Sequence, residues 1–156
     1  AKEIGKAIIV VINKTDLLSR EQLSELKKNI SNEPALNGLP CCFISAMEKK
    51  GFRSLFDQIY RVLQNADTNI STNKLNKILS QAKEAKSIPY KGKFKPKIRY
   101  IHQGGKNPHI LTLHGNSLEK LEGSYQRFLT NFFHKKLNLS GITIKLKFIN
   151  SKNPYN

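Results

Sequence analysis

Four polar residues, Asn13, Lys14, Thr15 and Asp16, directly follow an unbroken apolar run over residues 7–12. A carboxylate at the last position can accept two hydrogen bonds, and guanine offers a ring N–H and an exocyclic amine side by side, whereas adenine does not. The Lys14 stem can lie along the face of a base, and the Asn13 amide can join neighbouring loops or reach the base edge. These residues indicate recognition of a guanine base rather than bond-making chemistry.

The flanking sequence predicts the secondary-structure elements that hold this loop in place. The apolar run 7–12 shows no polar alternation, which is typical of a strand covered on both faces in a parallel α/β sheet. Residues 41–44 predict a second buried strand, which ends in Ser45 and Ala46. Between them, residues 17–30 have the apolar spacing of a helix. One face of this helix is formed by Leu18, Leu23, Leu26 and Ile30.

The predicted elements follow the order strand, loop, helix, strand and loop, which is the order of a right-handed crossover. Open α/β sheets bind ligands at the carboxyl ends of such strands. Asn-Lys-x-Asp and Ser-Ala are the base-recognition loops of the GTPase superfamily, which this pair resembles. The resemblance implies that the backbone N–H of Ala46 donates to the guanine carbonyl. Asp16 has an alternative role as the N-cap of the helix predicted over residues 17–30, because Asn-Lys-Thr-Asp is also an ordinary turn composition.

The parts of a GTPase that handle phosphate are missing from these 156 residues. No Gly-x-x-x-x-Gly-Lys-Ser/Thr loop occurs, no Asp-x-x-Gly follows a strand, and no upstream threonine is placed to act as a switch. Phosphate binding, Mg²⁺ binding and positioning of the attacking water would depend on those parts. We therefore expect no GTP hydrolysis by this chain alone and weak nucleotide binding at most. Residues 1–6 read as the tail of a helix entering a strand, which predicts a partial chain.

Charge divides the chain unevenly. Residues 1–66 carry 10 Lys and Arg against 7 Asp and Glu, whereas residues 67–156 carry 17 against 4. The two adjacent cysteines, Cys41 and Cys42, are expected to be free thiols in a cytoplasmic protein. No run approaches the roughly 20 apolar residues of a membrane span. The four histidines lack the neighbours of a metal site, so we predict none.

The basic second half predicts a small α+β domain. Ser71 is a plausible N-cap for a helix carrying Leu75, Ile78, Leu79 and Ala82. Strands are predicted over residues 97–101 and 109–114, joined by a turn-rich loop as an antiparallel hairpin. A helix follows over residues 121–137, and a strand over residues 142–148 alternates apolar and basic residues. The order is α-β-β-α-β, with helices on one face of a three-stranded sheet.

Such a charge suggests RNA as a partner, because neutralisation of phosphates supplies most sequence-independent affinity. An acidic partner domain would also favour lysines. Tyr90, Phe94 and Tyr100 could stack on unpaired bases, whereas Phe128, Phe132 and Phe133 are expected in the core. The candidate phosphate contacts are Lys91, Lys93, Lys95, Lys97, Arg99, Lys145 and Lys147.

Three segments carry a more extended resemblance: residues 98–108 with His114-Gly115-Asn116, residues 124–129, and Asn153-Pro154-Tyr155. Together they closely resemble the C-terminal KH-like domain of the Der (EngA) family of bacterial GTPases, and residues 1–66 resemble the end of that family's second G domain. The expected fold is thus a partial P-loop GTPase domain of α/β class, with only its C-terminal strands and helices, over residues 1–66. A KH-like α+β domain over residues 67–156 follows it.

The resemblance implies a role in assembling the large ribosomal subunit, with GTP or GDP bound in the complete protein. Ribosomal RNA and the G domains of the same protein are the implied partners. By match of motif, the guanine contacts are Asn13, Lys14, Asp16, Ser45 and Ala46. Thr15 stands where the family often has Trp, Met47 stands where many GTPases have Lys, and no Gly-x-x-Gly clamp is present. The alternative is a stand-alone basic RNA-binding module without a nucleotide function.

Overall fold

The computed structural model describes residues 6–36, 38–90, 92–93, 95–106 and 108–151. The first part contains β1 (Val10–Ile12), α1 (Arg20–Asn32), β2 (Cys41–Phe43) and α2 (Phe52–Asp67). The second part contains α3 (Thr72–Ala85), β3 (Lys97–Gly105), β4 (His109–Asn116), α4 (Gly123–Leu137) and β5 (Ile144–Asn150). Within the described residues, no helix has the length and apolar character needed to cross a membrane.

The first strand pair confirms the predicted parallel arrangement, with Val10 opposite Cys41 and Ile12 opposite Phe43. The strand predicted over residues 7–12 is shorter than expected, and its coverage on both faces is wrong for this structure, since Val11 is 43% exposed. The physical reason is that β2 is the one strand paired with β1 in the described chain. The two faces of β1, which would be buried in a larger parallel sheet, therefore remain partly exposed to solvent.

Helix α1 begins at Arg20 and not at Leu17 as predicted. Its N-cap is Ser19, whose hydroxyl accepts from the Gln22 N–H at 3.2 Å, while the Gln22 side chain accepts from the Ser19 N–H at 2.9 Å. This reciprocal capping box satisfies two otherwise unpaired donors of the first turn. Asp16 instead lies in a separate 3₁₀ turn, Thr15–Leu17, so the alternative role of Asp16 as the cap of this helix is wrong.

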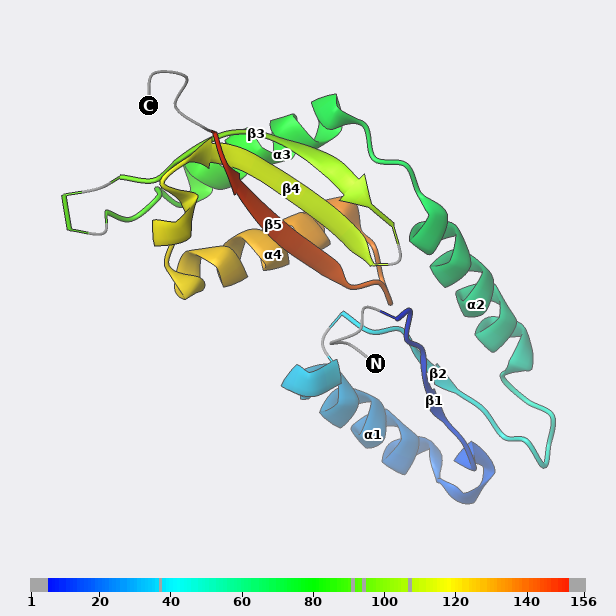
Figure 1. Ribbon diagram of the computed structural model, residues 1–156. Coiled ribbons are helices and arrows are strands. Elements are labelled where there is room, and N and C mark those ends of the chain that lie inside the picture. The colour runs from blue at the N-terminus through cyan, green and yellow to red at the C-terminus, as the bar shows by residue number, and fades with distance from the viewer. Residues whose placement is uncertain (1–5, 37, 91, 94, 107, 152–156) are drawn as a thin grey trace.

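The second part has the predicted α-β-β-α-β order. Its sheet has the strand order β3-β4-β5, with β3 and β4 antiparallel and β4 and β5 parallel. Helices α3 and α4 lie on the same side of this sheet (Figure 1). Several boundaries differ from prediction. Strands β3 and β4 continue to Gly105 and Asn116, which shortens the hairpin connection on the side of β3, helix α4 begins at Gly123, and β5 runs from Ile144 to Asn150.

The core of the second part lies between the sheet and the two helices. Tyr125 and Phe133 of α4 are fully buried, as are Leu111 and Leu113 of β4. Phe128 and Phe132 are partly buried and pack against this core, so the prediction of core positions for the helix aromatics is confirmed fully only for Phe133.

Helix α2 joins the two parts through this same core. Val62 and Ala66 of α2 are 3% and 8% exposed and belong to the hydrophobic cluster of the second part. Gly141 bridges the parts as well: its carbonyl accepts from the Ile8 N–H at 2.9 Å and its N–H donates to the Gly38 carbonyl at 3.2 Å. Gly141 has φ +77°, and a Cβ there would lie 2.8 Å from the Val62 side chain, so a larger residue would disturb the junction.

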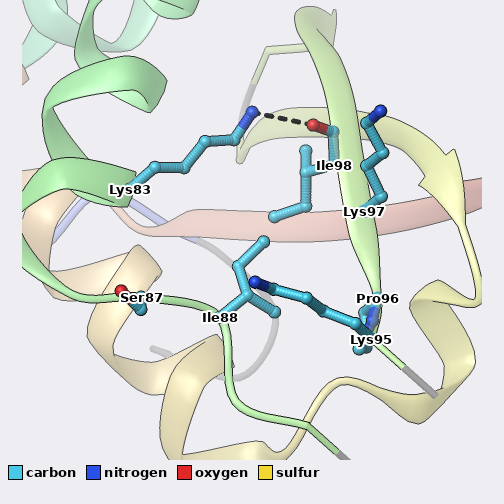
Figure 2. Close-up of a pocket in the computed structure, with 7 residues that line it drawn as sticks. All are labelled: Lys83, Ser87, Ile88, Lys95, Pro96, Lys97 and Ile98. Atoms are coloured by element: carbon cyan, nitrogen blue, oxygen red, sulfur yellow. Dashed lines mark hydrogen bonds between the residues drawn. The ribbon is translucent and has the colours of Figure 1, made fainter. Parts of the chain in front are cut away.

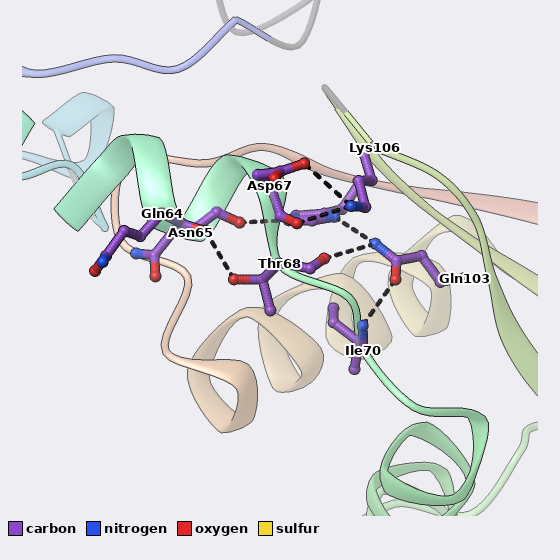
Figure 3. A network of polar contacts seen from close by, with 8 residues as sticks. Gln64, Asn65, Asp67, Thr68, Ile70, Gln103 and Lys106 are labelled. Atoms are coloured by element: carbon purple, nitrogen blue, oxygen red, sulfur yellow. Dashed lines mark hydrogen bonds and ion pairs between the residues drawn. The ribbon is translucent and has the colours of Figure 1, made fainter. Parts of the chain in front are cut away.

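A buried polar network fixes the path of the chain between α2 and α3 (Figure 3). His109 is fully buried, with Nε2 2.8 Å from the Asn65 carbonyl and Nδ1 2.8 Å from Gln103 Nε2. A carbonyl can only accept, so Nε2 carries the proton and Nδ1 accepts from the Gln103 amide. The same amide donates to the Thr68 carbonyl at 3.2 Å and accepts from the Ile70 N–H at 2.8 Å.

Replacing His109 with Phe should lower the free energy of unfolding by about 1–3 kcal/mol per buried partner left unpaired. The ring volume is largely kept, but the Asn65 carbonyl keeps only the Thr68 N–H at 3.3 Å as a donor, and one N–H of the Gln103 amide loses its acceptor while the other still donates to the Thr68 carbonyl. Urea unfolding followed by circular dichroism measures this loss. The control is Lys106→Ala, which removes an exposed contact to Asp67 at 3.1 Å and should cost less than about 1 kcal/mol. Equal losses in the two variants would contradict a structural role for the network.

Candidate functional site

The two predicted base-recognition loops meet at the carboxyl ends of β1 and β2. The Thr15 N–H and hydroxyl both donate to the Ile44 carbonyl, at 3.1 and 2.9 Å. The Asn13 side-chain oxygen accepts from two backbone N–H groups, that of Lys14 at 2.8 Å and that of Ala46 at 3.1 Å. One asparagine thus joins the loops directly.

A pocket of about 370 Å³ lies between the loops. It includes Leu17 and Met47, which are 73% and 86% exposed and were not among the predicted site residues. Their apolar side chains could cover a flat ring. Motif spacing alone could not find Leu17, because that residue lies just outside the four-letter pattern. The complete lining is Asn13, Lys14, Asp16, Leu17, Ala46 and Met47.

Lys14 adopts the left-handed backbone region, with φ 64° and ψ 36°. This conformation is uncommon for a residue with a Cβ, and it persists where surrounding contacts hold it. Here the bond from the Lys14 N–H to the Asn13 side chain supports it. The bend starts the 3₁₀ turn that carries Asp16.

Asp16 keeps unused capacity to accept hydrogen bonds. Its Oδ1 is buried and has no hydrogen-bond partner among the described residues. The Ser45 hydroxyl, followed by the backbone of Asp16 itself, holds the pKa of the Asp16 carboxyl below its usual value. Ser45 is only 1% exposed and also accepts from the Glu48 N–H at 3.1 Å. Ser45 therefore acts beside the pocket rather than in its lining.

Gly51 closes the second loop. Ser45 and Lys50 exchange two backbone hydrogen bonds, at 3.1 and 3.0 Å, and Gly51 follows with φ +83°. A Cβ at Gly51 would collide with the Phe43 carbonyl, so glycine allows α2 to start directly beside β2. Sequence reasoning missed this residue, although a glycine directly before a helical pattern was a usable signal.

The basic residues of the second part form separate groups. Lys95 and Lys97 line a cleft of about 460 Å³ together with Lys83, which sequence reasoning missed (Figure 2). The Lys83 ammonium donates to the Ile98 carbonyl at 2.7 Å, and burial, then the charge of Lys97, lowers the pKa of Lys83. Among the described residues the lining contains no carboxylate and consists of Lys83, Ser87, Ile88, Lys95, Pro96, Lys97 and Ile98.

The other candidate phosphate contacts lie elsewhere. Lys145 and Lys147 are exposed on β5, which is separated from β3 by β4. Lys93 and Arg99 are exposed, whereas Lys91 lies outside the described residues. The structure therefore does not gather the predicted basic residues into one patch.

The candidate stacking aromatics differ in their surroundings. Tyr90 is 64% exposed, and the Lys95 ammonium lies 4.9 Å from its ring centre. Tyr100 is 46% exposed, and its ring lies 4.5 Å from that of His114 with an angle of 4° between the planes. Phe94 lies outside the described residues.

Comparison with known proteins assigns both parts of the chain. Residues 69–148 match the KH-domain-like family found at the C-terminus of EngA bacterial GTPase enzymes, which is more than half of the chain. The chain belongs to the EngA (Der) family. Residues 1–65 match the GTP-binding domain family of elongation factor Tu. The expected combination of a partial GTPase domain and a KH-like domain is confirmed.

Several bacterial Der proteins are similar over nearly the whole chain. GTPase Der of Neisseria meningitidis serogroup C is 38% identical over 156 residues, covering 99% of this chain and 32% of that protein. GTPase Der of Thiobacillus denitrificans is 41% identical over 98% of this chain and 33% of its own length. That of Chromobacterium violaceum is 36% identical, with 99% and 33% coverage. The chain spans about a third of the length of these curated relatives.

The contact between Ser45 and Asp16 can be tested by titration. Ser45→Ala should raise the pKa of Asp16 toward 3.8, because the hydroxyl that stabilises the ionised carboxylate is gone. A lowered folded-state pKa adds stability above the unfolded value and loses it as pH falls through the folded value. The stability gap between wild type and variant should therefore shrink in acid.

Carbon-13 NMR of the Asp16 carboxyl between pH 2 and 6 measures this pKa. The control is Ser31→Ala, which removes an exposed serine whose hydroxyl donates to the Lys28 carbonyl. An unchanged Asp16 titration in Ser45→Ala would show that the hydroxyl does not act on this carboxylate.

Proposed function

We propose that this chain forms the guanine-recognition and RNA-contacting part of a GTP-binding protein that acts in the cytoplasm on assembly of the large ribosomal subunit. The observation that carries the nucleotide half of this proposal is the Asn13 side chain, which joins the two loops around one pocket. The relatives' name, GTPase Der, and the match to a GTP-binding domain family support it.

In this proposal each loop residue has a separate task. Asp16 accepts from the ring N–H and exocyclic amine of guanine, and Lys14 lies along the base. Ser45 holds Asp16 ionised. The Ala46 N–H, which donates to Asn13 at 3.1 Å, is shared with or transferred to the guanine carbonyl when the base enters. Asn13 thus accepts the bond that the guanine carbonyl would share or take over.

The phosphates and Mg²⁺ of the nucleotide would be held by segments outside these residues. Among the described residues, no group of three or more His, Cys, Asp or Glu could hold a metal ion. The outer face of α2 exposes Phe56, Tyr60 and Leu63 by 61–64%, and Val11 of β1 is also exposed. We propose that the remainder of a G domain covers these apolar surfaces, which are unusual for a free helix face.

The RNA half of the proposal is supported by charge. Residues 67–156 carry 17 basic and 4 acidic side chains, more than solubility requires. The cleft at Lys83, Lys95 and Lys97 offers cations beside apolar walls and no carboxylate. Phosphate oxygens are suitable ligands for such a cleft. Ribosomal RNA is the proposed partner.

Base recognition predicts a specificity switch in a chimera, in which this chain replaces the matching third of Neisseria meningitidis GTPase Der. Asp16→Asn should weaken GTP binding by about 10- to 100-fold, since an amide accepts only one of the two bonds. Xanthosine triphosphate should bind better than GTP, because its second carbonyl can accept from the amide N–H. Equilibrium titration with both nucleotides measures the ratio.

The control is Asp57→Asn, which makes the same change of charge at an exposed position of α2. It should leave the ratio unchanged. If Asp16→Asn kept the wild-type preference for GTP, the guanine assignment would be refuted.

The second candidate function, an RNA-binding module without a nucleotide role, is favoured by the concentration of charge in residues 67–156. Either function predicts that affinity for single-stranded RNA falls steeply with salt, with a logarithmic slope of about −0.7 per phosphate contacted. Lys95→Gln with Lys97→Gln should reduce this slope, whereas Lys28→Gln with Arg61→Gln removes equal charge from the first part and should not. A flat salt response of the wild type would contradict RNA contact through phosphates.

A further inference from the structure

The sheet of the second part has one face without a helix. Helices α3 and α4 pack on the side of Ile101, Leu111 and Leu113, so the alternate residues of each strand face the opposite side. The register places Tyr100 opposite His114, which is opposite Ile149, and places His102 opposite Thr112, which is opposite Lys147. The open face is therefore formed by Tyr100, His102, Ile110, Thr112, His114, Lys145, Lys147 and Ile149.

A β-bulge turns Tyr100 toward this face. The pairing shifts between Ile98, opposite Gly115, and Tyr100, opposite His114, which leaves Arg99 without a partner position. Strand residues two apart normally share a face, so without the extra residue Tyr100 would lie with Ile98 in the core. The bulge therefore presents an aromatic ring to solvent.

Three rings stack across this face. The rings of Tyr100 and His114 lie 4.5 Å apart and nearly parallel, and those of His102 and His114 lie 5.0 Å apart at 25°. Burial, and then the nearby His102, lowers the pKa of His114, which favours the neutral form of that ring. The Tyr100 and His102 rings are 6.3 Å apart, so the three rings form a triangle rather than a column, and Tyr100 remains 46% exposed, which leaves part of its ring open to a further flat group.

Positive charge lies beside the rings, and no acidic residue occurs among the positions of the open face. Lys147 is opposite Thr112, next to His102 and His114, and Lys145 is opposite Ile110. Neighbouring strands are about 4.8 Å apart, so the lysines of β5 lie roughly 10 Å from β3. A planar ring on Tyr100 and an anionic group near Lys147 can thus belong to one extended ligand.

We propose that this open face binds single-stranded RNA, with a base stacked on Tyr100 and backbone phosphates near Lys145 and Lys147. The inference rests on the proposed RNA contact and locates it. Sheet aromatics that stack unpaired bases are a recurring solution in RNA recognition. An acidic protein segment would pair with the lysines but would not stack on the aromatic rings. An experiment that removes the Tyr100 ring can therefore distinguish RNA from an acidic protein partner.

The test uses the full 156-residue chain and a fluorescent 12-nucleotide oligouridylate. Tyr100→Ala should weaken binding about 5- to 100-fold without changing the salt slope, because stacking is not electrostatic. Tyr100→Phe should restore near wild-type affinity. The matched control is Tyr60→Ala, which removes a tyrosine that is 64% exposed on α2, outside the proposed RNA contacts. Lys145→Gln with Lys147→Gln should weaken binding and reduce the salt slope.

A second measurement does not depend on folding of the variants. In the wild type, the ring-proton NMR signals of Tyr100 should move on adding oligouridylate more than those of the exposed Tyr60 of α2. If the wild type binds with a steep salt response but neither the Tyr100 signals nor Tyr100→Ala responds, the stacking site is overturned and RNA contact stands. If the wild type binds no RNA, both are overturned. Equal binding of polyglutamate, unaffected by Tyr100→Ala, would also overturn the stacking site in favour of an acidic partner.

Discussion

The packing of α2 against the second hydrophobic core is the constraint on which the arrangement of this chain depends. Val62 and Ala66 bury their side chains among residues of the KH-like part, and the buried His109 donates from Nε2 to the Asn65 carbonyl near the C-terminal end of α2. Separating the two parts would expose the buried face of α2 to water and break buried hydrogen bonds, and both changes cost free energy. The two parts therefore cannot swing apart without exposing α2. The junction is a shared core rather than a flexible linker.

This constraint sets where the two loops at the ends of β1 and β2 lie relative to the KH-like part. The KH-like part contacts Ile8 and Gly38, before β1 and β2, whereas the base-recognition loops follow the opposite ends of those strands. Helix α2 spans the same interval: it begins just after the Ser45–Lys50 turn and ends at the polar network of His109 (Figure 1). A helix of 16 residues is about 24 Å long. Because α2 is a rigid element, a movement of the Ser45–Lys50 turn at its start would also move its other end, which packs against the KH-like part.

Sequence patterns predicted those features that local chemistry determines. The two loops, the Ser71 cap and the α-β-β-α-β order follow from short-range periodicity and turn residues, and they agree with the structure. Burial of residues 7–12 was predicted wrongly, because it depends on neighbouring strands and not on the strand itself. The bulge at Arg99 was not predicted: it shifts the alternation so that Ile98 and Ile101, three residues apart, both lie in the core, and the apolar residues 98, 100 and 101 alone do not show which of them faces outward. Lys83 was missed because its proximity to Lys97 arises only when α3 packs on β3.

The separation of the basic groups has a geometric consequence for any RNA that contacts them. Lys83 lies on α3, so the cleft that it lines with Lys95 and Lys97 opens on the helix-covered side of the sheet, whereas Tyr100 and Lys147 face the open side. Strand β3 is an edge of the sheet, and the bulged, exposed Arg99 lies on that edge between the two sides. A charge and a bulge on an edge strand normally discourage pairing with other chains. A single strand that contacted both sides would have to turn at this edge, where Arg99 supplies a cation, whereas a rigid duplex could not make such a turn.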